Sequence, residues 1–267
     1  MEKEIAIITL HGMGDYKHDY YEELKGELAK KLDTDWQKVV FEAVQYQPIL
    51  QNNQNKIWEE MNAAYQLDGS ILRRFLLFGF SDAGSLEYSA RSSASDQYIQ
   101  VQKEIMQALD NVYFQLDGKN KPVIIIAQSL GCQVISNYIW DARNGTGIFK
   151  SLEPDASGEI KEFRRLKSCV QLLTTGCNIP MFVGGLNPIK AIEKPNDKFT
   201  WVNYFDKNDV LGWPLSPLSD SYKALVKDYE INVGGIFSSW NPWSHGQYWT
   251  DKDVIDPLVQ KIRSYMK

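Results

Sequence analysis

A serine stands where a short apolar run gives way to a segment with helical spacing. Residues 123–127 read Val-Ile-Ile-Ile-Ala, which is typical of a buried strand, and Ser129 follows within Ala-Gln-Ser-Leu-Gly (127–131). Small residues on both sides suit a tight strand–turn–helix junction, because the strand and helix backbones pass close together there. Such a junction presents the hydroxyl oxygen of Ser129 as a nucleophile. A serine that only caps a helix after a core strand is the alternative.

A second loop has the composition needed to stabilise negative charge. An apolar run near the start of the chain ends in His-Gly-Met-Gly (11–14). Acyl transfer to a serine needs two backbone N–H donors for the oxyanion, one after the nucleophile and one from a loop after an early strand. Leu130 and Met13 are the expected pair, and Gly12 and Gly14 let the loop turn back. An ordinary glycine turn is the alternative.

The chain has three histidines, and only one of them follows the serine. A serine nucleophile needs a general base to take its proton, and His245 is the candidate for that role. His245 lies just before an amphipathic stretch at 253–265, where a final helix is expected. His18 precedes an expected helix and is expected to face solvent. A loop histidine packed among tryptophans is the alternative for His245.

Two aspartates follow the apolar strand 199–205, and either could orient a general base. Asp206 comes at the end of the strand and Asp209 one turn later. A carboxylate beside the imidazole fixes the tautomer that leaves Nε2 free, and it stabilises the imidazolium that forms when the serine loses its proton. The residues alone leave both aspartates open for this role.

These pieces resemble the α/β-hydrolase superfamily, and more closely its bacterial lipase and carboxylesterase branches. The matching parts are His-Gly-Met-Gly at 11–14, Ala-Gln-Ser-Leu-Gly at 127–131, an aspartate after a late strand, and a histidine near the end of the chain. In that order they span most of the 267 residues. Two departures stand out, namely Ala127 for the usual Gly and Gln128 for a frequent His.

The resemblance implies roles for individual residues. In the family the partners follow in the chain order Ser, acid, His, which implies that His245 is the general base. The family pattern Asp-x-x-Asp-(Pro/Val) matches 206–210 and implies that Asp209 orients His245, while Asp206 braces the loop. It also implies that His11, with Gly12 and Gly14 beside it, supports the oxyanion loop and is not the base. The expected chemistry is ester cleavage through a covalent acyl-enzyme.

Length and composition fit this interpretation. The 267 residues are 43% hydrophobic, so we expect a single domain over 1–267. A net charge of −5 provides no basic face and excludes a nucleic-acid partner. No run of about 18 apolar residues occurs, so no membrane span is expected. The first strand begins too early to leave room for a signal peptide, which favours the cytoplasm. Three cysteines without paired spacing do not indicate a disulfide framework.

Strand-like and helix-like segments alternate along the chain. This order predicts the α/β class, with a mainly parallel, doubly wound sheet of about six strands and helices on both faces. Apolar stripes at helical spacing predict helices near 19–33, 98–116 and 253–265. The expected strands lie near 4–10, 38–45, 122–127, 168–174, 200–205 and 229–234.

Residues 47–95 form an insertion between a strand and the next expected core helix. They hold one amphipathic helical pattern and the apolar run Phe-Leu-Leu-Phe at 75–78. Such a run is too apolar to face water unless it covers a pocket, a lipid surface or a partner. We therefore expect a helical cap or lid over the serine, and the alternative is a surface that forms a homodimer.

Other chemistries fit poorly. A Gly-x-Gly-x-x-Gly dinucleotide motif after a strand and a phosphate-binding Gly-x-x-x-x-Gly-Lys-(Ser/Thr) loop are both absent. A zinc site of three histidines would use every histidine at distant positions, so no metal and no cofactor are expected. Cys177, after the strand at 168–174, is a weaker candidate nucleophile. The prediction is a serine hydrolase acting on a small-molecule ester; a thioesterase, an acyltransferase and a non-catalytic binding protein with this fold are the alternatives.

Overall fold

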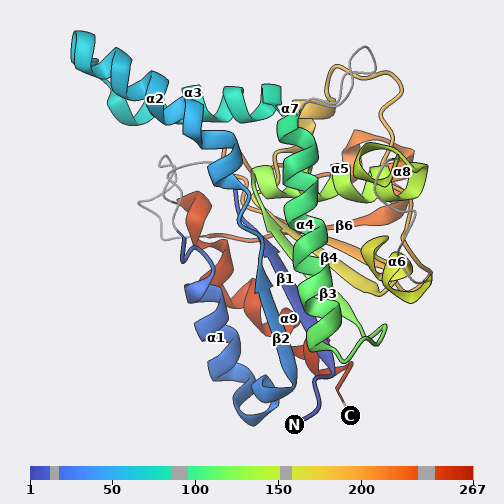
Figure 1. Ribbon diagram of the computed structural model, residues 1–267. Coiled ribbons are helices and arrows are strands. Elements are labelled where there is room, and N and C mark those ends of the chain that lie inside the picture. Colours follow the sequence, from blue (N-terminus) through green and yellow to red (C-terminus); the bar gives the residue numbers. More distant parts are fainter. Residues whose placement is uncertain (13–17, 86–95, 151–157, 234–243, 267) are drawn as a thin grey trace.

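A six-stranded parallel sheet forms the centre of the protein. The computed structural model describes residues 1–12, 18–85, 96–150, 158–233 and 244–266 (Figure 1). All neighbouring strands run parallel, in the order β2-β1-β3-β4-β5-β6. The strands are β1 (Ile5–Leu10), β2 (Val39–Ala43), β3 (Val123–Gln128), β4 (Cys169–Thr175), β5 (Thr200–Phe205) and β6 (Val226–Glu230).

Helices cover both faces of the sheet. Successive side chains of a strand point to opposite faces, so Ile5 and Ile7 of β1 belong to one buried cluster, and Ala6 and Ile8 to the other. The helices α1 (Glu22–Leu32) and α9 (Lys252–Arg263) contribute to the first cluster. The second cluster includes side chains from α4 (Asp96–Gln115), α5 (Leu130–Asn144), α6 (Gly158–Arg164) and α8 (Asp220–Leu225), and Figure 1 shows α4 crossing that face.

Short elements complete the described part of the chain. They are α7 (Ile179–Val183) and the 3-10 helices η1 (Asp33–Lys38), η2 (Gly147–Lys150), η3 (Ser216–Leu218) and η4 (Ser244–Thr250). The predicted α/β class is confirmed, and the sheet is parallel throughout. The predicted last strand at 229–234 is displaced, because β6 ends at Glu230. The buried Ile231 and Val233 lie beyond it, in a segment that hydrogen-bonds to the end of β5.

The insertion after β2 is a helical hairpin. Helices α2 (Gln47–Tyr65) and α3 (Ser70–Ser85) contact each other, and Figure 1 shows the pair projecting from the body at the end where the strands finish. Within the predicted apolar run, Phe78 is buried and Leu76 is exposed. Residues 86–95 of the insertion lie outside the described residues.

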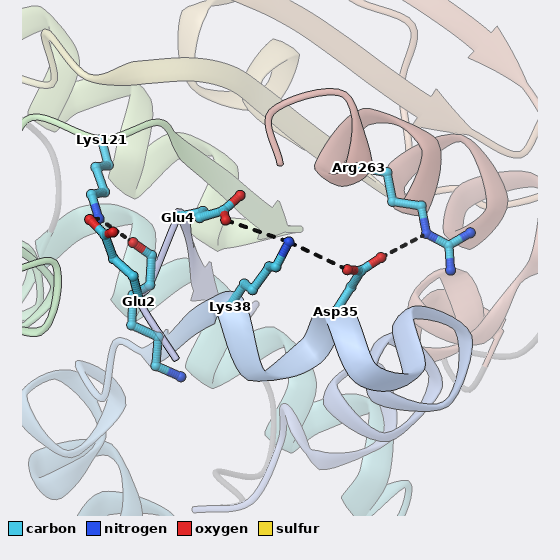
Figure 2. A network of polar contacts seen from close by, with 7 residues as sticks. Glu2, Glu4, Asp35, Lys38, Lys121 and Arg263 are labelled. Carbon is cyan, nitrogen blue, oxygen red and sulfur yellow. Dashed lines mark hydrogen bonds and ion pairs between the residues drawn. The ribbon is translucent and has the colours of Figure 1, made fainter. Parts of the chain in front are cut away.

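Ion pairs gather where the strands begin. Lys38, just before β2, lies 3.5 Å from Glu4 and 3.8 Å from Asp35, and Asp35 lies 3.6 Å from Arg263 of α9 (Figure 2). These pairs join the start of the chain to η1 and α9. Nearby, Glu2 pairs with Lys119 and Lys121, which precede β3. All of these ion pairs lie at the opposite end of the sheet from Ser129, which follows the last residue of β3.

Candidate active site

Ser129 occupies a strained junction between β3 and α5. Its backbone has φ 51° and ψ −122°, a region that residues other than glycine seldom adopt. The Ser129 N–H donates to the carbonyl oxygen of Thr175 in β4 at 3.0 Å, which fastens the turn to the neighbouring strand. The side chain is only 1% exposed, and its Oγ has no hydrogen-bond partner in the described part of the chain. Strain combined with an unused hydroxyl is typical of a functional position.

Two glycines allow the backbone to close around this serine. A Cβ at Gly131 would lie 2.7 Å from the carbonyl oxygens of Leu10 and His11, so the first turn of α5 needs a glycine next to the end of β1. A Cβ at Gly12 would lie 2.5 Å from Cβ and 3.0 Å from Oγ of Ser129. Gly12 is therefore required for space, whereas the sequence suggested it for its freedom to turn.

The loop after β1 thus lies directly against the serine. This places His11 and Gly12 beside Ser129, with Leu130 as the first residue of α5. Met13 and Gly14 lie outside the described residues. The expected oxyanion donor at Met13 therefore stays a prediction, as does the donor at Leu130.

His11 is held between aromatic rings. Its ring centroid lies 4.2 Å from that of Tyr20 and 5.9 Å from that of Tyr46, and the Tyr46 hydroxyl donates to the His11 carbonyl oxygen. Burial lowers the pKa of His11 to about 4. Gln47 Nε2 donates to the Gly12 carbonyl oxygen at 3.3 Å. His11 is thus neutral near pH 7, and the first residues of α2 contact the loop that touches Ser129.

Asp206 binds the backbone with both carboxylate oxygens. Oδ1 accepts from the N–H of Asn208 at 2.8 Å, and Oδ2 accepts from the N–H of Val233 at 2.8 Å. These bonds join the end of β5 to the segment after β6. Such contacts suit the brace that the resemblance assigns to Asp206.

Asp209 instead faces the segment that carries His245. Its Oδ1 accepts from the N–H of Leu211 at 3.0 Å, and its Oδ2 accepts from the hydroxyl of Tyr248 at 2.9 Å. A Cβ at Gly212 would lie 2.6 Å from Oδ2 of Asp209, so the loop needs a glycine to wrap around this carboxylate. Asp209 is nearly buried, and a carboxylate in that setting needs such donors.

The 3-10 helix η4 is fastened on two sides. The Tyr248 hydroxyl accepts from the Asp206 N–H at 3.0 Å while it donates to Asp209, and Trp249 Nε1 donates to Oγ1 of Thr175 at 3.2 Å. Burial, followed by the charge of Asp209, raises the pKa of Tyr248, which keeps the hydroxyl protonated as a donor. Tyr248 therefore links both aspartates to η4. Trp249 links η4 to Thr175 at the end of β4, the residue whose carbonyl oxygen also accepts from the Ser129 N–H.

His245 lies in η4, three residues before Tyr248, and its side chain is outside what the structure describes. The backbone nevertheless places the loop after β1, Ser129, Asp209 and η4 at one end of the sheet. The sequence interpretation missed Tyr248 and Trp249. Their signal was their place beside His245, since each ring combines an apolar body with a polar group that needs a partner when buried.

We find no metal centre in the described part of the chain, where no group of three His, Cys, Asp or Glu side chains could hold an ion. All three cysteines are free and buried. Within the described ranges, no helix has the length and apolar character that a membrane crossing requires. The chain matches no protein-family model and no curated protein.

Proposed function

We propose that the protein is a serine hydrolase that cleaves carboxylic esters through a covalent acyl-enzyme. The observation that carries the proposal is the state of Ser129, which has a positive φ, lies against Gly12 and has an unused Oγ. A helix cap does not account for it, because the Ser129 side chain makes no capping hydrogen bond to α5. Backbone strain of this kind is concentrated at functional sites in proteins.

In the proposed reaction, Ser129 Oγ attacks the acyl carbon while His245 takes the hydroxyl proton. His245 then gives that proton to the leaving alcohol. In the second half of the reaction, His245 takes a proton from water as the water attacks the acyl-enzyme, and it returns the proton to Ser129 Oγ as the acid leaves. Asp209 orients His245, and the N–H groups of Met13 and Leu130 bind the oxyanion. The firm attachment of η4 through Tyr248 supports this assignment, because a base must be held close to its orienting acid.

The helical hairpin of α2 and α3 gives the proposal a second element. Its root contacts the loop beside Ser129 through Gln47, whereas its far part carries the exposed apolar side chains Ile57, Met61 and Tyr65 at four-residue spacing. We propose that the hairpin acts as a cap that controls access of bulky esters. Because Gln47 at the root of the hairpin contacts Gly12, movement of the cap would shift the loop that lies against Ser129.

The test is covalent labelling with a fluorophosphonate, which reacts with an activated serine. We expect labelling of the wild type at Ser129, no labelling of Ser129→Ala, and a loss of turnover by roughly 10⁴ to 10⁶ in that variant. Ser136→Ala, on the same helix, is the matched control and should label normally. A folded wild-type protein that fails to label would favour the non-catalytic binding protein. Oxygen esters and thioesters of one acyl group then separate an esterase from a thioesterase.

A further inference from the structure

One buried side chain near the candidate site has no structural role that its contacts explain. Asn178 follows β4 and precedes α7, and it is 1% exposed. Neither its Nδ2 nor its Oδ1 has a hydrogen-bond partner among the residues that the structure describes. Burying both halves of a carboxamide without partners is unfavourable, and folded proteins rarely do so without a reason.

Asn203, on the next strand, shows how this fold treats a structural carboxamide. Its Oδ1 accepts from Oγ1 of Thr174 at 2.8 Å, and its Nδ2 donates to the Trp213 carbonyl oxygen at 3.0 Å and to Asp228 at 2.7 Å. Both halves of that side chain are therefore satisfied by protein atoms. Asn178 differs from Asn203 in partners, although both are fully buried.

The turn that holds Asn178 is attached to both sides of the candidate site. The Cys177 thiol contacts the thiol of Cys132, which lies three residues after Ser129 on α5. The Cys177 carbonyl oxygen accepts from the N–H of Trp213 at 3.0 Å, in the loop that follows the proposed acid. Asn178 therefore follows a residue that neighbours both α5 and the acid loop, at the end of the sheet where the proposed ester would bind.

The surroundings indicate the kind of group that Asn178 would bind. Trp213 is 45% exposed and Met181 of α7 is 55% exposed, so apolar surface lies on both segments that flank this turn. A carboxamide offers one donor and one acceptor, so its complement carries both an acceptor and an N–H or O–H donor. An amide within an otherwise apolar substrate has this combination.

We propose that Asn178 is a specificity-determining residue that hydrogen-bonds an amide group of the ester bound at Ser129. This role rests on the proposed serine hydrolase function and narrows its substrate class. Asn178 selects esters whose acyl part carries an amide, because a hydrocarbon chain at that position leaves both of its polar atoms unpartnered. It takes no part in proton transfer.

The test uses three ethyl esters of similar length, with proton release as the assay. The acyl groups are N-acetylglycyl, with a donor and an acceptor; 4-oxopentanoyl, with an acceptor only; and pentanoyl, with neither. We expect wild-type kcat/KM to fall in that order. Asn178→Leu should lower kcat/KM for the N-acetylglycyl ester by roughly 10- to 100-fold, the usual size of a lost hydrogen bond to a buried group, and leave the pentanoyl ester nearly unchanged.

Thermal unfolding separates recognition from a structural role. Asn178→Leu should unfold at the wild-type temperature or above it, since an apolar residue of similar size removes two unpartnered atoms. The matched control Asn203→Leu should unfold several degrees lower, because it breaks three hydrogen bonds. An equal loss on all three esters, no loss on the N-acetylglycyl ester, or a fall in unfolding temperature like that of Asn203→Leu would each overturn the role of Asn178.

Fluorophosphonate labelling keeps the two proposals apart. Asn178→Leu should label at Ser129 as fast as the wild type, because the probe lacks the amide. If both proteins label but the ester profile does not depend on residue 178, only the specificity role is wrong. If the wild type does not label, the hydrolase proposal fails and the role of Asn178 fails with it.

Discussion

The two ends of the parallel sheet differ in how their polar residues are arranged. Where the strands begin, charged side chains such as Glu4, Lys38 and Asp35 pair with one another near the surface (Figure 2). Where the strands finish, Ser129 is strained, Gly12 leaves no room for a side chain, and Asn178 is buried without partners. The difference teaches that the strained and unpartnered groups around the candidate site gather where the strands finish, whereas the ion pairs of Figure 2 lie where the strands begin.

Magnitudes sharpen the contrast. A surface ion pair such as that of Lys38 with Glu4 contributes roughly 0–1 kcal/mol, so the amino end of the sheet is close to neutral for stability. A residue held at positive φ costs about 1–3 kcal/mol, and a buried polar group without a partner costs a similar amount. Ser129 and Asn178 therefore each cost stability at the carboxyl end, and the two buried clusters around the sheet offset that cost. We expect activity to depend on the carboxyl end alone.

The largest expected effect separates the two aspartates of the acid loop. Asp209→Asn should lower kcat by about 10⁴, the loss seen when a base histidine is held in the wrong tautomer. Asp206→Asn should change kcat little and lower the free energy of unfolding by about 1–2 kcal/mol, because an amide nitrogen then faces one of two backbone N–H donors. Steady-state kinetics and denaturant unfolding of both variants show which aspartate controls turnover and which one stabilises the loop. The reversed result would make Asp206 the acid.

Crowding the serine should have the next largest effect. The methyl group of Gly12→Ala would lie 2.5 Å from Cβ of Ser129, so one of the two segments must move. A displacement of about 1 Å in a reacting group lowers turnover by roughly 10²-fold. Gly26→Ala, with no atom within 4 Å of the added carbon, is the matched control, and it should leave turnover unchanged and stabilise α1 by about 0.5–1 kcal/mol. Full activity in Gly12→Ala would contradict the close approach.

Much of the fold was predictable from the sequence, because buried strands of a parallel sheet are continuous apolar runs. Residues 122–127 and 168–174 predicted β3 and β4 to within a residue. The edge strand β6 was misplaced, since its sequence Val-Lys-Asp-Tyr-Glu is mostly polar and the apolar Ile231 beyond it drew the prediction too far along the chain.

The candidate site was predictable only where chemistry is local. Ser129 was identified by its immediate neighbours, which the strand–turn–helix junction constrains. Tyr248 stands near His245 in the sequence, but its hydrogen bond to Asp209 joins residues far apart in the chain. Asn178 has no local signal, because what distinguishes it is the lack of a partner in the folded protein. Long-range hydrogen bonds leave no periodic signal, so only the folded chain reveals them.

The pH dependence of stability offers a third test, centred on His11. Its pKa is about 4 in the folded protein and lies near 6.5 when the chain is unfolded. The unfolded chain therefore binds the extra proton first. His11 destabilises the fold progressively as pH falls from 6.5 to 4, by up to about 3 kcal/mol, and has no such effect above pH 6.5. His11→Gln should flatten the fall in unfolding free energy between pH 7 and pH 4.5, whereas the exposed His18→Gln should not. Equal pH profiles for all three proteins would show that His11 is not buried in neutral form.

The smallest effect is expected at the amino end of the sheet. Glu2 pairs with Lys121 at 2.8 Å and with Lys119 at 3.1 Å, and these lysines lower its pKa to about 2. Its stabilising effect is therefore complete above pH 4.5 and disappears as pH falls towards 2. Glu2→Gln should lower the unfolding temperature at pH 7 by no more than about one degree, because the carboxylate is fully exposed and its pairs are screened by solvent. Ester turnover should stay within about twofold of wild type, far from the loss expected in Asp209→Asn. A fall in turnover larger than that of Asp206→Asn would break the comparison, since it would mean that the charged end of the sheet also controls the reaction.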